Sequence, residues 1–140
     1  MSIIYRGYAP ENHAGGRMVT VGDGNRFISV LPHVVKHSPP GFSWGYAGSG
    51  PAELARCVLI HALELAPDCD ECGGHGCWWC DGGYTEPSPA MYQQFKFDRI
   101  AGLPRDEGWE ITESEVKAWA AAWRSSHPQE AQRRTTLGGN

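Results

Sequence analysis

Apolar segments separated by turn residues in the first third of the chain predict a small antiparallel sheet. Ile3–Tyr8 fits a short strand. Arg17–Val21 and Arg26–Leu31 flank the segment Gly22–Asn25, whose composition and length are typical of a hairpin turn. Phe42–Tyr46, in a loop rich in Pro, Gly and aromatic residues, is a candidate for a further strand with its aromatic side chains on one face. The first part of the chain is therefore expected to be β.

The apolar positions then change to helical spacing. Pro51 is expected at the first position of a helix that ends before Pro67. A second helix is expected from Ser88 towards Leu103, and a third after Thr112, which forms a capping box with Glu115. The residues expected to face inward are Leu54, Ala55, Val58, Leu59, Ala62, Leu63, Met91, Tyr92, Phe95, Ile100, Val116, Trp119, Ala120 and Trp123. A sheet followed by helices predicts an α+β fold, a small antiparallel sheet packed with about three helices.

Length and composition indicate one domain. The 140 residues are expected to form a single domain over 1–126, with a zinc-binding insertion at 67–87 and a flexible polar tail at 127–140. A net charge of −4 disfavours a protein whose main task is to grip phosphate backbone. No export signal and no apolar run of about 18 residues is visible, so we expect a cytoplasmic protein that does not enter membranes.

Four cysteines between the first two helices predict one structural zinc ion. Cys69, Cys72, Cys77 and Cys80 form two CxxC pairs separated by four residues, and glycines allow the chain to reverse between them. Four thiolates complete a tetrahedral sphere and leave no position for water, which indicates structural rather than catalytic zinc. An iron–sulfur cluster and a redox dithiol are the alternatives. Trp78 and Trp79 lie within the second pair, and at least one is expected to face outward as a partner-binding residue.

The cysteine segment is also an internal repeat. Residues 69–76 fit CxxCxGxG, and residues 77–84 fit it again except at Tyr84. This resembles the zinc modules of bacterial J-domain co-chaperones, which contact protein. The resemblance implies the metal site and no chaperone activity.

The segment His37–Ala55, HSPPGFSWGYAGSGPAELA, resembles the hallmark of a family of small, uncharacterised phage and bacterial proteins, in which the cysteine segment would be an insertion. Segments 92–96 and 109–116 extend the resemblance. The family implies no activity, but its occurrence in phages and mobile elements favours a small accessory or counter-defence protein. Trp44 and Tyr46 of the hallmark are further candidates for partner binding.

Gly48, Ser49 and Gly50 are the candidate anion-binding residues, because they place backbone N–H groups at the start of the first expected helix. The pattern is neither of the common phosphate-binding loops, and Glu53, expected on the first turn, would compete with an anion. A structural turn is the competing interpretation.

No catalytic pattern is complete. Cys57 and His61 are four residues apart on the first expected helix, but Cys57 has the spacing of a small buried residue. We therefore expect no enzyme. The leading hypothesis is a non-enzymatic protein that binds and inhibits a host protein complex, as an anti-CRISPR protein does. The alternatives are a zinc-dependent nucleic-acid-binding regulator, and an anion-binding protein or enzyme that uses the Gly48–Pro51 loop.

Overall fold

The computed structural model describes residues 2–9, 17–35, 38, 41–64 and 87–128. These residues form four strands and three helices, which confirms the predicted α+β class. In chain order the elements are β1 (Ile3–Gly7), β2 (Val19–Asp23), β3 (Arg26–Val30), α1 (Ser49–Ala62), α2 (Pro89–Phe95) with a π-helical turn η1 (Lys96–Ile100), β4 (Trp109–Thr112) and α3 (Glu113–Ser126).

The sheet is antiparallel, in the order β3-β2-β1-β4. Tyr5 of β1 lies opposite Val21 of β2 and Ile111 of β4, and all three side chains are buried on the inner face. Side chains alternate along a strand, so the neighbours of these residues face outward. The predicted hairpin is present, but β2 extends to Asp23 and the turn is only Gly24-Asn25. Gly24 has φ of 60°, as a two-residue hairpin turn requires.

One expectation about the strands was wrong, and one strand was not predicted. Phe42–Tyr46 is not a strand, because only Phe42 forms an isolated bridge, with Arg17. Conversely, Trp109–Thr112 forms β4 and pairs with β1. The positive φ of 86° at Gly45 bends the chain away from an extended path, so the aromatic loop cannot continue as a strand.

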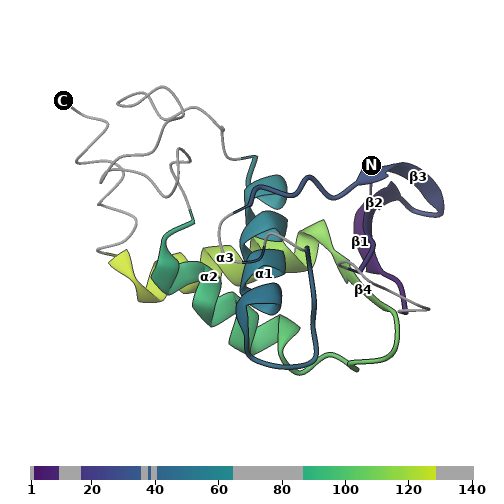
Figure 1. Cartoon of the computed structure of the whole chain (residues 1–140). Helices are drawn as coiled ribbons and strands as arrows, with labels where there is room; N and C mark the ends of the chain where they lie inside the picture. The colour runs from purple at the N-terminus through teal and green to yellow at the C-terminus, as the bar shows by residue number, and fades with distance from the viewer. Residues whose placement is uncertain (1, 10–16, 36–37, 39–40, 65–86, 129–140) are drawn as a thin grey trace.

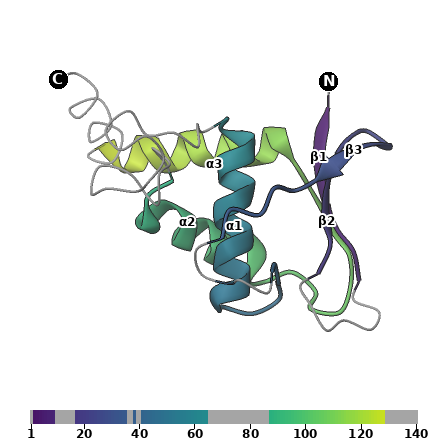
Figure 2. The same ribbon diagram turned by 45° about the horizontal axis from the view of Figure 1, so that its top comes forward.

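Helix α1 stands between the sheet and α2, while α3 runs from the end of β4 past α1 (Figures 1 and 2). The sequence predicts that only one apolar side of α1 is buried. In the structure α1 is buried on all sides, since every residue from Gly50 to Ile60 is buried. The helix begins at Ser49, two residues before the predicted Pro51. Pro51 is still tolerated, because the first four N–H groups of a helix have no partner within it.

The other helices follow the sequence closely. Ser88 caps α2 by accepting a hydrogen bond from the Met91 backbone N–H (3.2 Å). Thr112 caps α3 by accepting from Glu115 N–H (3.1 Å), as predicted. Of the residues expected to face inward, Leu63 and Trp119 are only partly buried and the others are buried. Among the described residues, no helix is long and apolar enough to cross a bilayer.

Candidate functional site

The predicted zinc ligands Cys69, Cys72, Cys77 and Cys80 lie outside the described residues, as do Trp78 and Trp79. The zinc ion therefore stays a prediction. In the part of the chain that the structure describes, no group of three or more His, Cys, Asp or Glu side chains is placed to hold a metal ion.

Trp44 is a core residue and not an exposed contact residue, so its assignment to partner binding was wrong. Its side chain is fully buried and packs edge-to-face on Trp109, with ring centroids 5.5 Å apart. The indole N–H donates to the Glu107 carbonyl (3.2 Å), and the Arg17 guanidinium lies 4.7 Å from the ring centroid. Every part of the side chain is thus engaged inside the protein.

Tyr46 is 40% exposed and remains available to a partner. Its ring packs against the turn that begins α1, because a Cβ built at Gly48 would lie 2.5 Å from it. A Cβ at Gly50 would lie 2.6 Å from that of Ser43. These close approaches explain both glycines as packing positions. Anion binding by Gly48, Ser49 and Gly50 stays a prediction that no described contact supports.

A polar cluster lies where α1 meets the segment 31–35, which follows β3 and which we call the strap. Glu53, entirely buried, accepts hydrogen bonds from His33 Nε2 (2.9 Å) and from the Ser38 backbone N–H (3.2 Å). The expectation that Glu53 occupies the first turn was wrong: it is the fifth residue of the helix and is directed at the strap. Arg56, also buried, donates to the Val34 carbonyl (2.9 Å). Glu53 and Arg56 thus bind the strap to α1 through buried polar contacts.

Cys57 and His61 do not act on each other. The Cys57 thiol donates to the Val34 carbonyl (3.7 Å), and burial raises its pKa to about 11. His61 Nδ1 instead pairs with the hydroxyl of Tyr5 (2.8 Å). Burial raises the pKa of the Tyr5 hydroxyl, and the charge of Glu113 adds to the shift. Cys57 therefore remains a thiol at neutral pH, and the two side chains have separate structural partners.

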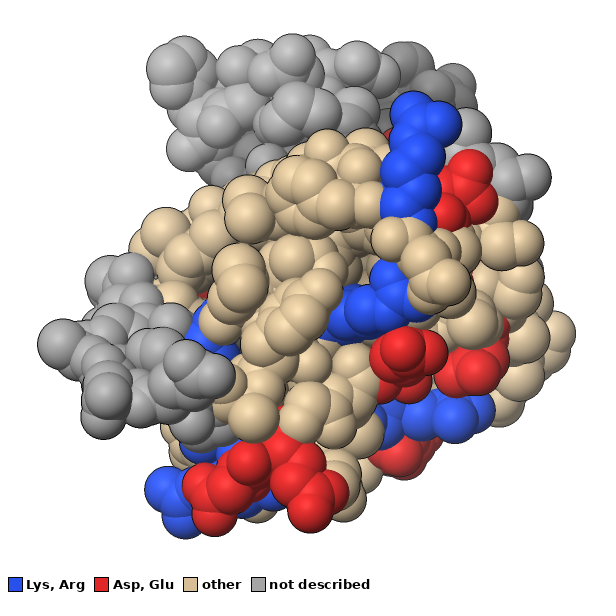
Figure 3. All heavy atoms as spheres, turned by 90° about the vertical axis from the view of Figure 1, so that its right-hand side faces the viewer, with Lys and Arg blue, Asp and Glu red and all other residues tan. Residues whose placement is uncertain are grey.

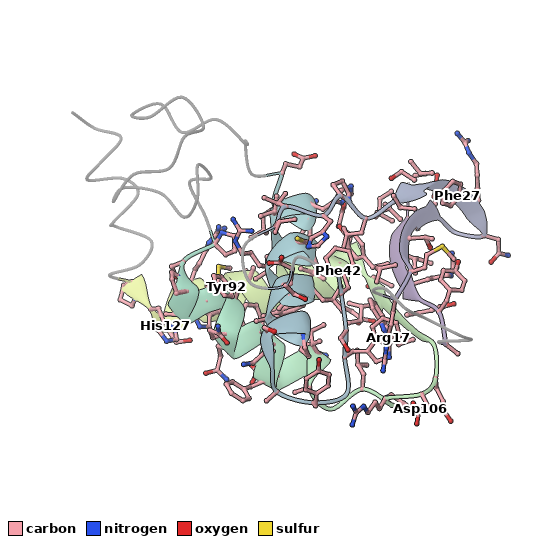
Figure 4. All side chains as sticks on the ribbon, in the orientation of Figure 1. Arg17, Phe27, Phe42, Tyr92, Asp106 and His127 are labelled. Atoms are coloured by element: carbon pink, nitrogen blue, oxygen red, sulfur yellow. The ribbon has the colours of Figure 1, made fainter. Side chains whose placement is uncertain are left out.

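Beside the strap lies a pocket of about 220 Å³. Arg17 and Phe42, which lie near each other in Figure 4, both line it, and the Arg17 backbone N–H donates to the Phe42 carbonyl (3.2 Å). The ring of His33 packs on that of Phe42, with centroids 4.8 Å apart. The remaining lining residues are Met18, Val19, Val30, Leu31 and Gly41. Arg17 and His33 are the basic residues of the lining, and the guanidinium of Arg17 lies over the Trp44 ring.

The second feature is the outer surface of the β2–β3 hairpin, for which the sequence analysis named no residue. Phe27 and Val30 of β3 are 63% and 56% exposed. Phe27 and Val30 pair with Gly22 and Thr20 of β2. The residues of β1 that lie opposite Gly22 and Thr20 also face the outer side of the sheet. Phe27 lies on the part of the sheet farthest from α2 (Figure 4). In the view from this side, uncharged residues cover much of the face, and basic and acidic residues are interspersed across its right half and its lower edge (Figure 3).

The model of a family of unknown function (DUF6166) matches residues 5–71, just under half of the chain. The chain is similar to this family there. The match covers the sheet from Tyr5 to β3, the strap and α1, and it supports an uncharacterised domain. No curated protein and no solved structure matches. Function must therefore be argued from the pocket and from the outer surface of the hairpin.

Proposed function

We propose that the protein is a non-enzymatic binding protein that engages a protein partner through the outer surface of the β2–β3 hairpin. The observation that carries this proposal is a set of large apolar side chains on a sheet edge that no described element covers. We define this hairpin surface by Tyr8, Met18, Phe27, Ile28 and Val30.

Three of these residues share one face of the sheet. Phe27 and Val30 lie opposite Gly22 and Thr20, and the Tyr8 hydroxyl bonds the Thr20 hydroxyl (3.2 Å). Ile28 lies at a shift in the register between β2 and β3, which removes the strict alternation of the strand. At 42–63% exposed, the five side chains present on the order of 400 Å² of apolar surface. Exposed apolar surface of this order on a monomer often marks an interaction site.

The position of β3 adds to the argument. It is an edge strand in the sheet order, so one side of its backbone has no neighbouring strand within the described sheet. Natural proteins usually protect such edges with charged residues, proline or short strands. Here Arg26, beside the turn, is the one charged residue in a strand of five. An extended segment of a partner could pair with β3 and cover its apolar side chains.

More specifically, we propose that the chain is a phage or mobile-element protein that inhibits a host protein complex in a counter-defence role. The support is the small size, the hairpin surface and the similarity to a family of unknown function. A structural zinc ion on Cys69, Cys72, Cys77 and Cys80 is part of the proposal and rests on their spacing alone. Elemental analysis of the purified protein should give about one zinc per chain, and a metal-free protein that folds normally would remove the zinc from the proposal.

The binding proposal is tested by capture from lysate of the natural host, with Phe27→Ser as the disrupting variant. Phe97→Ser is a matched control, because Phe97 is 58% exposed but lies on η1, away from the hairpin. The proposal predicts a stoichiometric protein partner for the natural chain and for Phe97→Ser, with the partner lost or weakened at least tenfold for Phe27→Ser. Equal capture by the two variants would place the contact elsewhere.

A further inference from the structure

We propose that β3 pairs with β3 of a second copy of this chain about a two-fold axis, and that this weak dimer covers the hairpin surface until a partner displaces it. The displacement rests on the proposed protein-binding function, whereas the dimer itself does not. The free backbone groups of β3, the position of its one charge and the apolar area beside it carry the inference.

The free backbone groups of β3 follow from its pairing with β2. The Leu31 backbone N–H donates to the Val19 carbonyl (2.9 Å), so the backbone of Leu31 is directed at β2. Bonded and non-bonded positions alternate along an antiparallel strand, so the N–H and C=O of Val30 point away from β2. At the other end of β3, Arg26 closes the two-residue turn against β2, so the same groups of Phe27 also point to the free edge.

The spacing of these groups fits a second copy. In a regular strand the backbone groups that point to one side recur at every second residue. Phe27 and Val30 are instead three residues apart, because the register with β2 shifts between them at Ile28. A two-fold axis between Ile28 and Ser29 places Phe27 of each copy opposite Val30 of the other, so identical spacings face each other and the free donors meet free acceptors.

The charge on β3 favours this antiparallel arrangement. Arg26 is the one charged residue of the strand and lies beside the turn. In the two-fold pair the two Arg26 side chains lie at opposite ends of the joined strands, whereas a parallel pair would set these like charges side by side. Strand β3 is at the end of the sheet away from the helices (Figures 1 and 2), so no described helix lies in the path of the second copy.

The apolar area sets the strength of the dimer. Two hairpin surfaces, each with on the order of 400 Å² of exposed apolar side chain, bring together on the order of 800 Å². Stable interfaces bury about 1,200–2,000 Å², so this contact is at the weak, reversible end of the range. Such a dimer shields Phe27 and Val30 from unrelated proteins, while a partner with further contacts displaces the second copy.

The test is sedimentation velocity of the full chain from about 10 µM to about 1 mM, with charge variants at Ile28, beside the axis. Ile28→Lys and Ile28→Glu each bring two like charges close together in the dimer, so each should weaken self-association at least tenfold. An equimolar mixture of the two variants should associate as the natural chain does, because opposite charges then meet. Phe97→Lys is the matched control, since Phe97 is 58% exposed on η1, and it should associate normally.

A natural chain that stays monomeric throughout this range would overturn the dimer. So would a mixture of the two Ile28 variants that does not associate, or a dimer that neither variant weakens. Displacement is measured by adding the partner captured from lysate to the dimeric chain: a complex with one copy of the chain supports it, and a complex that keeps two copies joined contradicts it. Capture of no partner would remove the displacement together with the proposed function, while sedimentation of the purified chain still decides the dimer.

Discussion

Replacing Glu53 by Gln tests whether the strap is held to α1 by a buried charge. The carboxylate is fully buried and accepts hydrogen bonds from His33 Nε2 (2.9 Å) and Ser38 N–H (3.2 Å). Each hydrogen bond to a charged group contributes about 1.5–3 kcal/mol, and Gln keeps an acceptor oxygen but not the charge. We expect the free energy of unfolding to fall by roughly 2–4 kcal/mol, which corresponds to a decrease of roughly 7–14 °C in Tm for a chain of this length.

Glu110→Gln is the matched control. Glu110 also pairs with a basic side chain, Arg6 (3.0 Å), but its own side chain is 63% exposed. A solvent-exposed ion pair contributes little, so this variant should lose less than about 1 kcal/mol. Urea unfolding of the two variants, followed by circular dichroism, measures the difference. If Glu53→Gln lost no more stability than Glu110→Gln, Glu53 would not be the residue that holds the strap.

Three further predictions follow from packing, pKa and capping. Gly7→Ala should lower the unfolding free energy by at least about 2 kcal/mol, because a Cβ there would overlap the Trp109 indole. Gly102→Ala is the control: no atom lies within 4 Å of the added Cβ, so this variant should be near neutral in the same urea assay. The raised pKa of Cys57 means that its thiol loses its proton in the unfolded chain near pH 9 but in the folded protein near 11. The stability that the buried thiol contributes is therefore complete below pH 9 and is lost as the pH rises to about 11. The difference in unfolding free energy between the natural chain and Cys57→Ala should shrink by up to about 3 kcal/mol across this window. A difference that stays constant would contradict the burial argument. Thr112→Ala should lose about 1 kcal/mol and Thr112→Ser almost none, since only the first removes the acceptor for Glu115 N–H.

The elements that the sequence predicted well are those whose signals are local. The caps at Ser88 and Thr112 and the apolar spacing of α2 and α3 depend on residues within a turn or two. Strand β4 was missed because its support is distant: Trp109–Thr112 has only two buried side chains, and it becomes a strand by pairing with β1 about a hundred residues earlier.

The candidate site depended still more on tertiary contacts. The position of Trp44 in a glycine-rich loop predicts an exposed side chain, but the return of the chain at β4 brings Trp109 against it. Burial of Glu53 also follows from the path of the strap, which no local pattern defines. The hairpin surface had one visible sign, since Phe27-Ile28-Ser29-Val30 lacks the alternation of a strand with one solvated face. Periodicity alone could not tell a strand buried on both faces from an exposed edge.

The most direct test of the binding function is hydrogen–deuterium exchange of the protein alone and with the partner that it captures. The proposal predicts slower exchange at the backbone amides of Arg26–Val30 and around Met18 when the partner is bound, with little change along α3. Protection confined to residues 65–86, with the amides of β3 unchanged, would show that the partner binds the cysteine segment and would contradict the role assigned to the hairpin surface.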